Sequence, residues 1–170
     1  MEFIYSDDKV NTQGKYKISR YYEDGQLKEE ANYKDGERNG LFKQWHSNGQ
    51  LEYEANYKDG KKVGLDKWWY KNGQLRSEAN YKDGEYDGLY NSWYEDGQLM
   101  SERTYKDGEL DGLTKRWYED GQLWYETNYK DGKLDGLHRK WHSNGQLKWE
   151  TTYKDGEQIS SAFDVSFQQI

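Results

Sequence analysis

The sequence contains no cysteine and no proline. Because there is no thiol, the chain can form neither a disulfide bond nor a cysteine-ligated metal site, and a reducing compartment would not weaken it. Because there is no proline, its turns must be formed by other residues, and Asp-Gly and Asn-Gly pairs recur throughout the sequence. Proline interrupts central β-strands, so its absence is compatible with a chain built from strands.

Long apolar segments are also missing. No part of the sequence is apolar enough to span a bilayer, and residues 1–16 lack the hydrophobic run of a secretory signal. We therefore expect a cytoplasmic location.

Apolar residues are scarce, and those present are mainly aromatic. Hydrophobic residues make up 32% of the chain and charged residues 34%, a balance typical of disordered proteins. Disordered chains are poor in aromatic residues, however, whereas this one has 17 Tyr and 8 Trp. Since each aromatic ring can bury about 150–250 Å², we expect an ordered but thin structure.

The formal net charge of −7 narrows the range of partners. Direct binding to nucleic acid or to an anionic membrane depends on clustered Lys and Arg, so this charge argues against both. A protein partner with a basic surface is the better electrostatic match.

A unit of 24 residues recurs along the chain. Each unit contains a glycine followed by Gln-Leu, and a second glycine lies 11 residues later, in most units within Tyr-Lys-Asp-Gly. Such recurrence predicts a repeat array, in which units stack because none can bury its own hydrophobic face. The first glycine series is Gly25, Gly49, Gly73, Gly97, Gly121 and Gly145.

Within one unit, from Leu41 to Gly64, two short aromatic-rich runs are separated by Ser-Asn-Gly, and the second is followed by Lys-Asp-Gly. Runs of this length bounded by these turn residues predict a β-hairpin. We therefore expect an all-β fold, an elongated single-layer antiparallel sheet of tandem 24-residue β-hairpin repeats. Six repeats would occupy residues 17–160, between an N-terminal cap at 1–16 and a C-terminal capping strand at 161–170, all in one continuous domain.

The register of the hairpin depends on the length of its loop. A two-residue Asn-Gly loop would place Lys43 opposite Glu54, whereas a three-residue Ser-Asn-Gly loop would place Trp45 opposite Leu51. Burying a large apolar side chain is worth about 1.5–3 kcal/mol, but an exposed ion pair only about 0.2–1 kcal/mol. We therefore expect the three-residue loop. It also predicts three cation-over-ring pairs, Lys43 with Tyr53, Lys115 with Tyr125 and Arg139 with Trp149.

This register defines two faces of the sheet. One of them, the expected packing face, carries Leu41, Trp45, Leu51, Ala55 and Tyr57 and their equivalents in the other repeats. The opposite face is polar and aromatic, and its Tyr and Trp side chains are of the kind that protein interfaces use. The candidate partner-binding residues there are His46, Glu54, Trp68, Tyr70, Glu78, Tyr94, Glu102, Tyr118, Trp124, Glu126 and His142.

Catalysis and metal binding have little support in the sequence. The glutamates that recur once per repeat would lie about 10 Å apart along a sheet, too far for a catalytic pair, and we expect each to hold a hydrogen bond within its own repeat. His46 and His142 stand where other repeats have Tyr, without convergent partners. We therefore expect no catalytic, cofactor or metal site and no enzyme activity.

The segment from Tyr81 to Glu102, Tyr-Lys-Asp-Gly-x-x-Asp-Gly-Leu-x-x-x-Trp-Tyr-x-Asp-Gly-Gln-Leu-x-x-Glu, resembles the bacterial variant of the MORN (membrane occupation and recognition nexus) repeat. The resemblance extends over most of the chain. It implies a single-layer array of hairpins that serves as a protein-binding scaffold, and many bacterial members are described as antitoxins beside secreted toxins. The eukaryotic repeat has also been linked to phospholipid binding.

Together these features lead us to expect an acidic protein-binding module. Its expected role is that of an inhibitor or immunity protein, antitoxin-like, that blocks a basic partner such as a toxin or another nucleic-acid-handling enzyme. It would be monomeric on its own. The alternatives are a structural or assembly scaffold and, with less support, a phospholipid- or glycan-binding module.

Overall fold

The computed structural model describes residues 3–4, 13–160 and 163–164 of the chain. Within these residues the regular elements are all β-strands, and nearly all neighbouring strands pair antiparallel. This confirms the predicted all-β array of tandem hairpin repeats. The chain divides into two units, residues 1–85 and 86–170.

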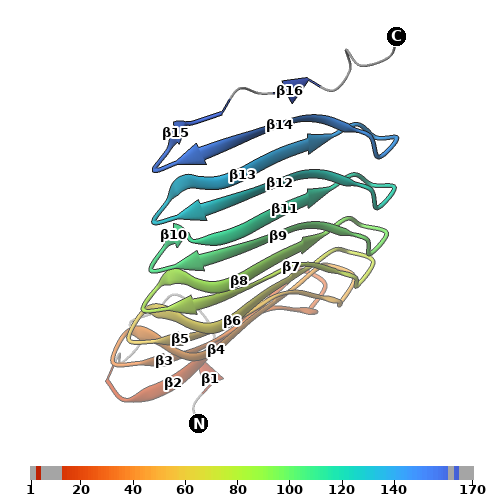
Figure 1. Cartoon of the computed structure of the whole chain (residues 1–170). Helices are drawn as coiled ribbons and strands as arrows, with labels where there is room; N and C mark the ends of the chain where they lie inside the picture. The colour runs from red at the N-terminus through yellow and green to blue at the C-terminus, as the bar shows by residue number, and fades with distance from the viewer. Residues whose placement is uncertain (1–2, 5–12, 161–162, 165–170) are drawn as a thin grey trace. The chain divides into compact units, whose positions relative to one another are not determined.

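In the first unit the strands lie in chain order in one sheet layer (Figure 1). The first strand is parallel to the second, and the later neighbours are antiparallel. That first strand is part of the predicted cap at residues 1–16, most of which lies outside the described residues. The strands are β1 Phe3–Ile4, β2 Lys15–Tyr21, β3 Leu27–Lys34, β4 Glu37–Trp45, β5 Leu51–Lys58, β6 Lys61–Trp69 and β7 Leu75–Lys82.

The second unit repeats the same hairpins. Its strands are β8 Glu85–Trp93, which begins at the last residue of the first unit, β9 Leu99–Lys106, β10 Glu109–Leu110, β11 Gly112–Trp117, β12 Leu123–Lys130, β13 Lys133–Trp141, β14 Leu147–Lys154, β15 Glu157–Gln158 and β16 Phe163–Asp164. Strands β10 and β11 together correspond to one strand of the first unit and are separated at Asp111. Strand β16 pairs antiparallel with β14 and is the described part of the predicted capping strand at 161–170.

The hairpin loops confirm the three-residue prediction. Between β4 and β5, the N–H of Gly49 donates to the carbonyl of His46 at 2.9 Å, and the N–H of His46 donates to the carbonyl of Gln50 at 2.8 Å. This is a type I turn followed by a left-handed residue, a position that Gly49 takes at φ 82°. The Asn48 side chain accepts from the Gln50 N–H at 3.1 Å, which explains why Asn or Asp precedes each of these glycines.

The turns that join one hairpin to the next are two-residue Asp-Gly turns. Lys58 and Lys61 flank one of them as a pair, and both central residues are left-handed, Asp59 at φ 48° and Gly60 at φ 75°. Left-handed backbone at both positions defines a type I′ turn, for which Asp-Gly is a strongly preferred sequence. The same conformation recurs at the other Asp-Gly turns of this series.

A one-residue β-bulge changes the register of each hairpin beyond its loop. Trp45 lies opposite Leu51, as predicted, but the next pair is Gln44 with Tyr53, so Glu52 has no residue opposite it. Beyond the bulge, the pairing is the one that a two-residue loop would have produced. The hairpin therefore combines the Trp–Leu pair of one alternative with the ion pair of the other.

The predicted cation-over-ring pairs are wrong for this reason. Loop length decides only the pairs next to the loop, because the bulge then adds one residue to one strand. Each cation consequently lies opposite a carboxylate and not a ring. The observed pairs are Lys43 with Glu54, Lys115 with Glu126 and Arg139 with Glu150.

The bulge also redistributes side chains between the two faces of the sheet. Residues directly opposite one another share a face, and neighbours along a strand alternate. We call one face the core face. In one repeat it carries Phe42, Gln44, Tyr53, Ala55 and Tyr57.

The other side is the outer face, and it carries Leu41, Lys43, Trp45, Leu51 and Glu54. The predicted packing face is therefore divided between the two sides. Its Leu and Trp members lie on the outer face, whereas its Ala and Tyr members lie on the core face.

Most of the buried side chains lie on the core face. In the first unit Ala31, Phe42, Tyr53 and Ala55 form an apolar cluster in which no side chain is more than 4% exposed. The second unit has the same buried positions but fills them differently. Its buried side chains are small and polar, namely Ser92, Ser101, Thr114, Thr127 and Thr151.

One buried polar cluster accompanies the apolar core of the first unit. The Tyr53 hydroxyl donates to Oδ2 of Asp66 at 2.6 Å, and Nζ of Lys62 donates to the same oxygen at 2.6 Å. Asp66 is only 4% exposed, so these two donors compensate its buried charge. Burial, together with the hydrogen bond to Asp66, raises the pKa of Tyr53.

We expect Asp66→Asn to lower the free energy of unfolding by about 1.5–3 kcal/mol, the usual contribution of hydrogen bonds to charged groups, because Lys62 loses its counter-ion. Urea denaturation of the whole chain measures the change. Asp135→Asn is the control, because Asp135 pairs with Lys154 at the surface, and it should leave the unfolding midpoint unchanged. Equal effects of the two substitutions would contradict this role for Asp66.

Candidate functional site

The repeats differ from one another mainly on the core face. On the outer face the same Leu, Trp and Glu residues return in almost every hairpin. Because every hairpin has the same backbone, recurring residues serve the fold, and changing residues are available for function. The position of Phe42 is taken in later repeats by Asp66, Tyr90, Thr114 and His138, and that of Gln44 by Trp68, Ser92, Arg116 and Lys140.

The candidate glutamates belong to the repeating outer face. Nζ of Lys43 lies 3.0 Å from Oε2 of Glu54, across the hairpin. This arrangement agrees with the interpretation that the glutamates recur because the hairpin recurs. Similar pairs join Glu78 to Lys67 at 3.7 Å and Glu126 to Lys115 at 3.7 Å and Arg139 at 3.6 Å, while Glu102 lies opposite Asn91.

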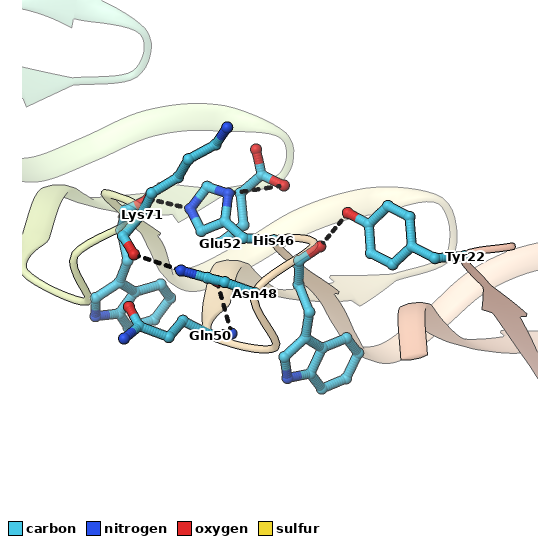
Figure 2. Close-up of polar contacts among 8 residues, drawn as sticks. Tyr22, His46, Asn48, Gln50, Glu52 and Lys71 are labelled. Carbon is cyan, nitrogen blue, oxygen red and sulfur yellow. Dashed lines mark hydrogen bonds and ion pairs between the residues drawn. The ribbon is translucent and has the colours of Figure 1, made fainter. Parts of the chain in front are cut away.

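The aromatic residue directly before each three-residue hairpin loop links that loop to the next repeat. Figure 2 shows Tyr22, whose hydroxyl donates to the carbonyl of Trp45 at 2.6 Å, and His46, whose Nε2 lies 3.1 Å from the carbonyl of Trp69. We call this series the loop row. In the second unit Tyr94 reaches Trp117 at 2.8 Å and Tyr118 reaches Trp141 at 3.0 Å, and Tyr70 and His142 hold the equivalent positions in their repeats.

The loop row could have been recognised from the sequence. Every member has a ring with a hydrogen-bonding group, and Phe never occurs at this position. A contact that needs only a ring would have tolerated Phe. The structural role of these rings therefore adds to the partner-binding role that the sequence suggested.

The core face of the second unit contains a cleft of about 280 Å³. Three cationic side chains line it, Arg103 from β9, Arg116 from β11 and Lys140 from β13. The guanidinium of Arg103 lies over the ring of Tyr90 at 5.2 Å, and Nζ of Lys140 lies over the ring of Trp124 at 5.5 Å. Within the described part of the chain, none of the three cations forms an ion pair with a carboxylate.

Aromatic side chains from neighbouring strands form most of the remaining cleft wall, together with Leu110 and Thr114. Trp124 and Tyr125 both face it, because the bulge places two consecutive residues of β12 on the same side. The loop row borders the cleft, since the ring of Tyr118 lies 5.8 Å from that of Trp124. Tyr129 and Trp149 complete the aromatic lining.

Several buried polar atoms in and beside this cleft have no hydrogen-bond partner. Among the described residues, all buried side-chain nitrogen and oxygen atoms without a partner belong to the second unit. In the first unit, by contrast, the core-face cation Arg38 donates to the Tyr57 hydroxyl at 3.4 Å. Buried polar groups are rarely left unsatisfied, so these atoms distinguish the second unit from the first. On the core face they are Nε of Arg103 and Arg116, Oγ1 of Thr114 and Thr127, and both ring nitrogens of His138.

Burial also shifts the titration of two groups on this face. It raises the pKa of Tyr125 to about 12, with the neighbouring Tyr129 adding to the shift. It lowers the pKa of His138 below its ordinary value of 6.5. At neutral pH both groups are therefore uncharged, and the positive charge of the cleft comes from its Arg and Lys side chains.

Comparison with known families agrees with the hairpin boundaries. The profile of the MORN repeat variant matches residues 17–35, 38–59, 62–83, 86–107, 110–131 and 134–155. The chain belongs to the MORN repeat family. Its MORN repeats make it a repeat-based binding or scaffold module. No curated protein matches the chain.

Two further observations on this MORN repeat chain concern metal binding and membrane crossing. No group of three or more His, Asp or Glu side chains within residues 13–160 is placed to hold a metal ion. The described residues also form no helix that is long and apolar enough to cross a membrane.

The structure distributes the predicted site residues of the MORN array over three places. The glutamates lie on the outer face, and His46, Tyr70, Tyr94, Tyr118 and His142 form the loop row. Trp68 lies on the core face, where its ring is 4.2 Å from that of Tyr53, and Trp124 lines the cleft. The sequence interpretation missed the cleft residues Arg103, Arg116, Lys140 and Trp149. These residues could have been recognised from the sequence, because they stand at positions at which the MORN repeats differ from one another.

The half-buried His138 makes the stability of the second unit depend on pH. It lies opposite Thr127 and Thr151 and contacts the rings of Tyr125 and Trp149, so the residues facing it carry no charge at neutral pH. Because its pKa is lowered in the folded state, the unfolded chain takes up the proton first as the pH falls below 6.5. The stability that neutral His138 contributes is thus present above pH 6.5 and is lost as the pH falls toward the lower pKa of the folded state.

We therefore expect the free energy of unfolding to fall between about pH 7 and pH 5, and to fall less in His138→Phe. Phe is a suitable replacement because Phe42 holds this position in an earlier repeat. Urea denaturation at several pH values measures both profiles. Parallel profiles of the two proteins would contradict the assignment to His138.

Proposed function

We propose that this MORN repeat protein is a protein-binding module whose core face contacts the partner. The observation that carries the proposal is that the repeats keep their outer face and change their core face. In a repeat array every unit meets the same folding requirements, so differences between units are available for selection by a partner. The extended surfaces of such arrays suit protein partners.

The chemistry of the core face supports a protein partner. Trp, Tyr and Arg dominate the energetics of protein interfaces. All three residue types occur on the core face of each unit, and in the second unit they line the cleft. The rings are held by one another, for example Tyr86 and Tyr105 with centroids 4.9 Å apart. Rings fixed in this way lose little conformational freedom on binding, which favours affinity.

The finer part of the proposal is an inhibitor or immunity role against a basic partner such as a toxin or another nucleic-acid-handling enzyme. Two considerations support it, the resemblance to antitoxin-like bacterial repeats and the formal net charge of −7. The outer-face glutamates are largely neutralised by Lys and Arg, but exposed loops carry further carboxylates, such as Glu23, Asp24, Glu119 and Asp120. These would attract a basic protein at long range and speed its encounter. In this proposal the protein is cytoplasmic and is monomeric before it binds its partner.

The proposal is tested by capturing the partner from cells that produce the protein and comparing two variants. Trp124→Met changes the core face, and Lys115→Asn changes the outer face; Met100 and Asn91 hold these positions in an earlier repeat, so both should fold. We expect Trp124→Met to weaken binding about tenfold or more, as for an aromatic interface anchor. Lys115→Asn should change the affinity by less than about twofold.

Equal losses in both variants would contradict the core-face assignment. The electrostatic part has its own readout, because attraction between an acidic module and a basic partner weakens with added salt. An association rate that does not respond to salt would contradict the finer proposal and leave the core-face assignment intact.

A further inference from the structure

The cleft of the second unit concentrates positive charge in a protein of formal net charge −7. Arg103, Arg116 and Lys140 converge on it without carboxylate partners among the described residues. A cation left half-buried and unpaired is costly unless a counter-charge reaches it. In the first unit the core-face cations have polar partners, since Lys62 pairs with Asp66 and Arg38 donates to the Tyr57 hydroxyl. The cleft is therefore complementary to a negatively charged group.

Apart from Arg116, the core-face residues with unpartnered atoms form a continuous row across neighbouring strands. Thr114 lies opposite Thr127, and Thr127 lies opposite His138. Continuing the pairing of β9 with β11 by one residue places Arg103 beside Thr114. A parallel row next to it contains Arg116, Tyr125, Lys140 and Trp149, each opposite the next. All four residues of the second row line the cleft, whereas of the first row only Arg103 and Thr114 do. The second row places cations and rings side by side over several strands, as a segment lying across them would require.

The size of the cleft favours protruding side chains over a whole small molecule. Its volume of about 280 Å³ lies at the lower limit of the range of about 300–1,000 Å³ that is typical of small-molecule sites, so it offers room for a few side chains. The guanidinium groups of Arg103 and Arg116 suit carboxylates, which they can bind through two parallel hydrogen bonds. The indole rings of Trp124 and Trp149 supply apolar area beside them.

Charge distinguishes among the possible anionic ligands. A nucleic acid needs a positive groove that follows its backbone, and a membrane surface is typically bound by clusters of about 4–8 Lys and Arg. Three cations within an acidic protein meet neither requirement, but they match a short segment with a few carboxylates. We propose that this cleft binds an acidic peptide segment of a protein partner, whose carboxylates pair with Arg103, Arg116 and Lys140.

This inference rests on the proposed function, because it names the chemistry of one part of the core face. It is compatible with a basic partner, since net charge governs the encounter and local charge governs the register of the complex. A partner with a basic surface and one acidic segment would satisfy both.

The test uses the whole protein and a random dodecapeptide display library. Selection on the wild-type protein should enrich peptides with an excess of Asp and Glu. An enriched peptide, synthesised with a fluorescent label, is then titrated against variants that carry residues from sister repeats and should therefore fold. The variants are Arg103→Ala, as in Ala55, and Arg116→Gln and Lys140→Gln, as in Gln44, with Lys115→Asn as the outer-face control that loses the same charge.

We expect each cleft variant to bind the peptide about tenfold more weakly, since a hydrogen-bonded charge pair is lost. The control should bind as the wild type does. Replacing Asp and Glu of the peptide by Asn and Gln should reduce its affinity by a similar factor. Failure to enrich any peptide, enrichment of basic or neutral peptides, or equal binding by Arg116→Gln would overturn the proposal.

Two further probes exclude the other anionic ligands. A uridine oligonucleotide and phosphatidylserine vesicles should bind neither the wild type nor the variants. Binding of either probe that is lost in Arg116→Gln would assign the cleft to that ligand and overturn the peptide proposal. These outcomes are separate from the proposed function, because a failed peptide selection leaves the comparison of Trp124→Met with Lys115→Asn on the captured partner unaffected.

Discussion

One inserted residue in each hairpin determines how the repeat is organised. The loop sets Trp45 opposite Leu51, and the bulge at Glu52 then brings Lys43 opposite Glu54. Without the bulge these two pairs would need different registers, because a shift of one residue moves the side chains of a strand to the other face. With the bulge, both pairs lie on the outer face of every repeat, and the core face is left free to vary.

The two units use the same backbone for different chemistry. In the first unit the core-face polar groups satisfy one another, as Tyr53 and Lys62 do at Asp66. In the second unit, two repeats further on, the positions of Tyr53, Lys62 and Asp66 hold Ser101, Leu110 and Thr114. The core-face cation Arg116 has no carboxylate partner there among the described residues. The contrast arises from side chains alone, since the hairpin geometry recurs. One array can therefore contain a segment closed on itself and a segment open to a ligand.

Sequence reasoning succeeded where structure is decided locally. Asn48 and Gly49 specified the three-residue loop, and Asp59 and Gly60 specified the type I′ turn, because few residues adopt a left-handed backbone. It failed beyond the loop, because the bulge has no residue preference that reveals it. The bulge position is taken in successive repeats by Lys28, Glu52, Arg76, Met100, Trp124 and Lys148.

The sequence by itself determined the repeat length, both turns, the pairing of Trp45 with Leu51 and the membership of a β-hairpin family, because each depends on residues close together in the chain. Only the tertiary structure decided which residues share a face. It placed Lys43 opposite the carboxylate of Glu54 and not opposite the ring of Tyr53. It also brought Arg103, Arg116 and Lys140, which belong to three strands, into one cleft. The physical reason is the two-residue period of a β-strand, in which one additional residue exchanges the faces of everything that follows.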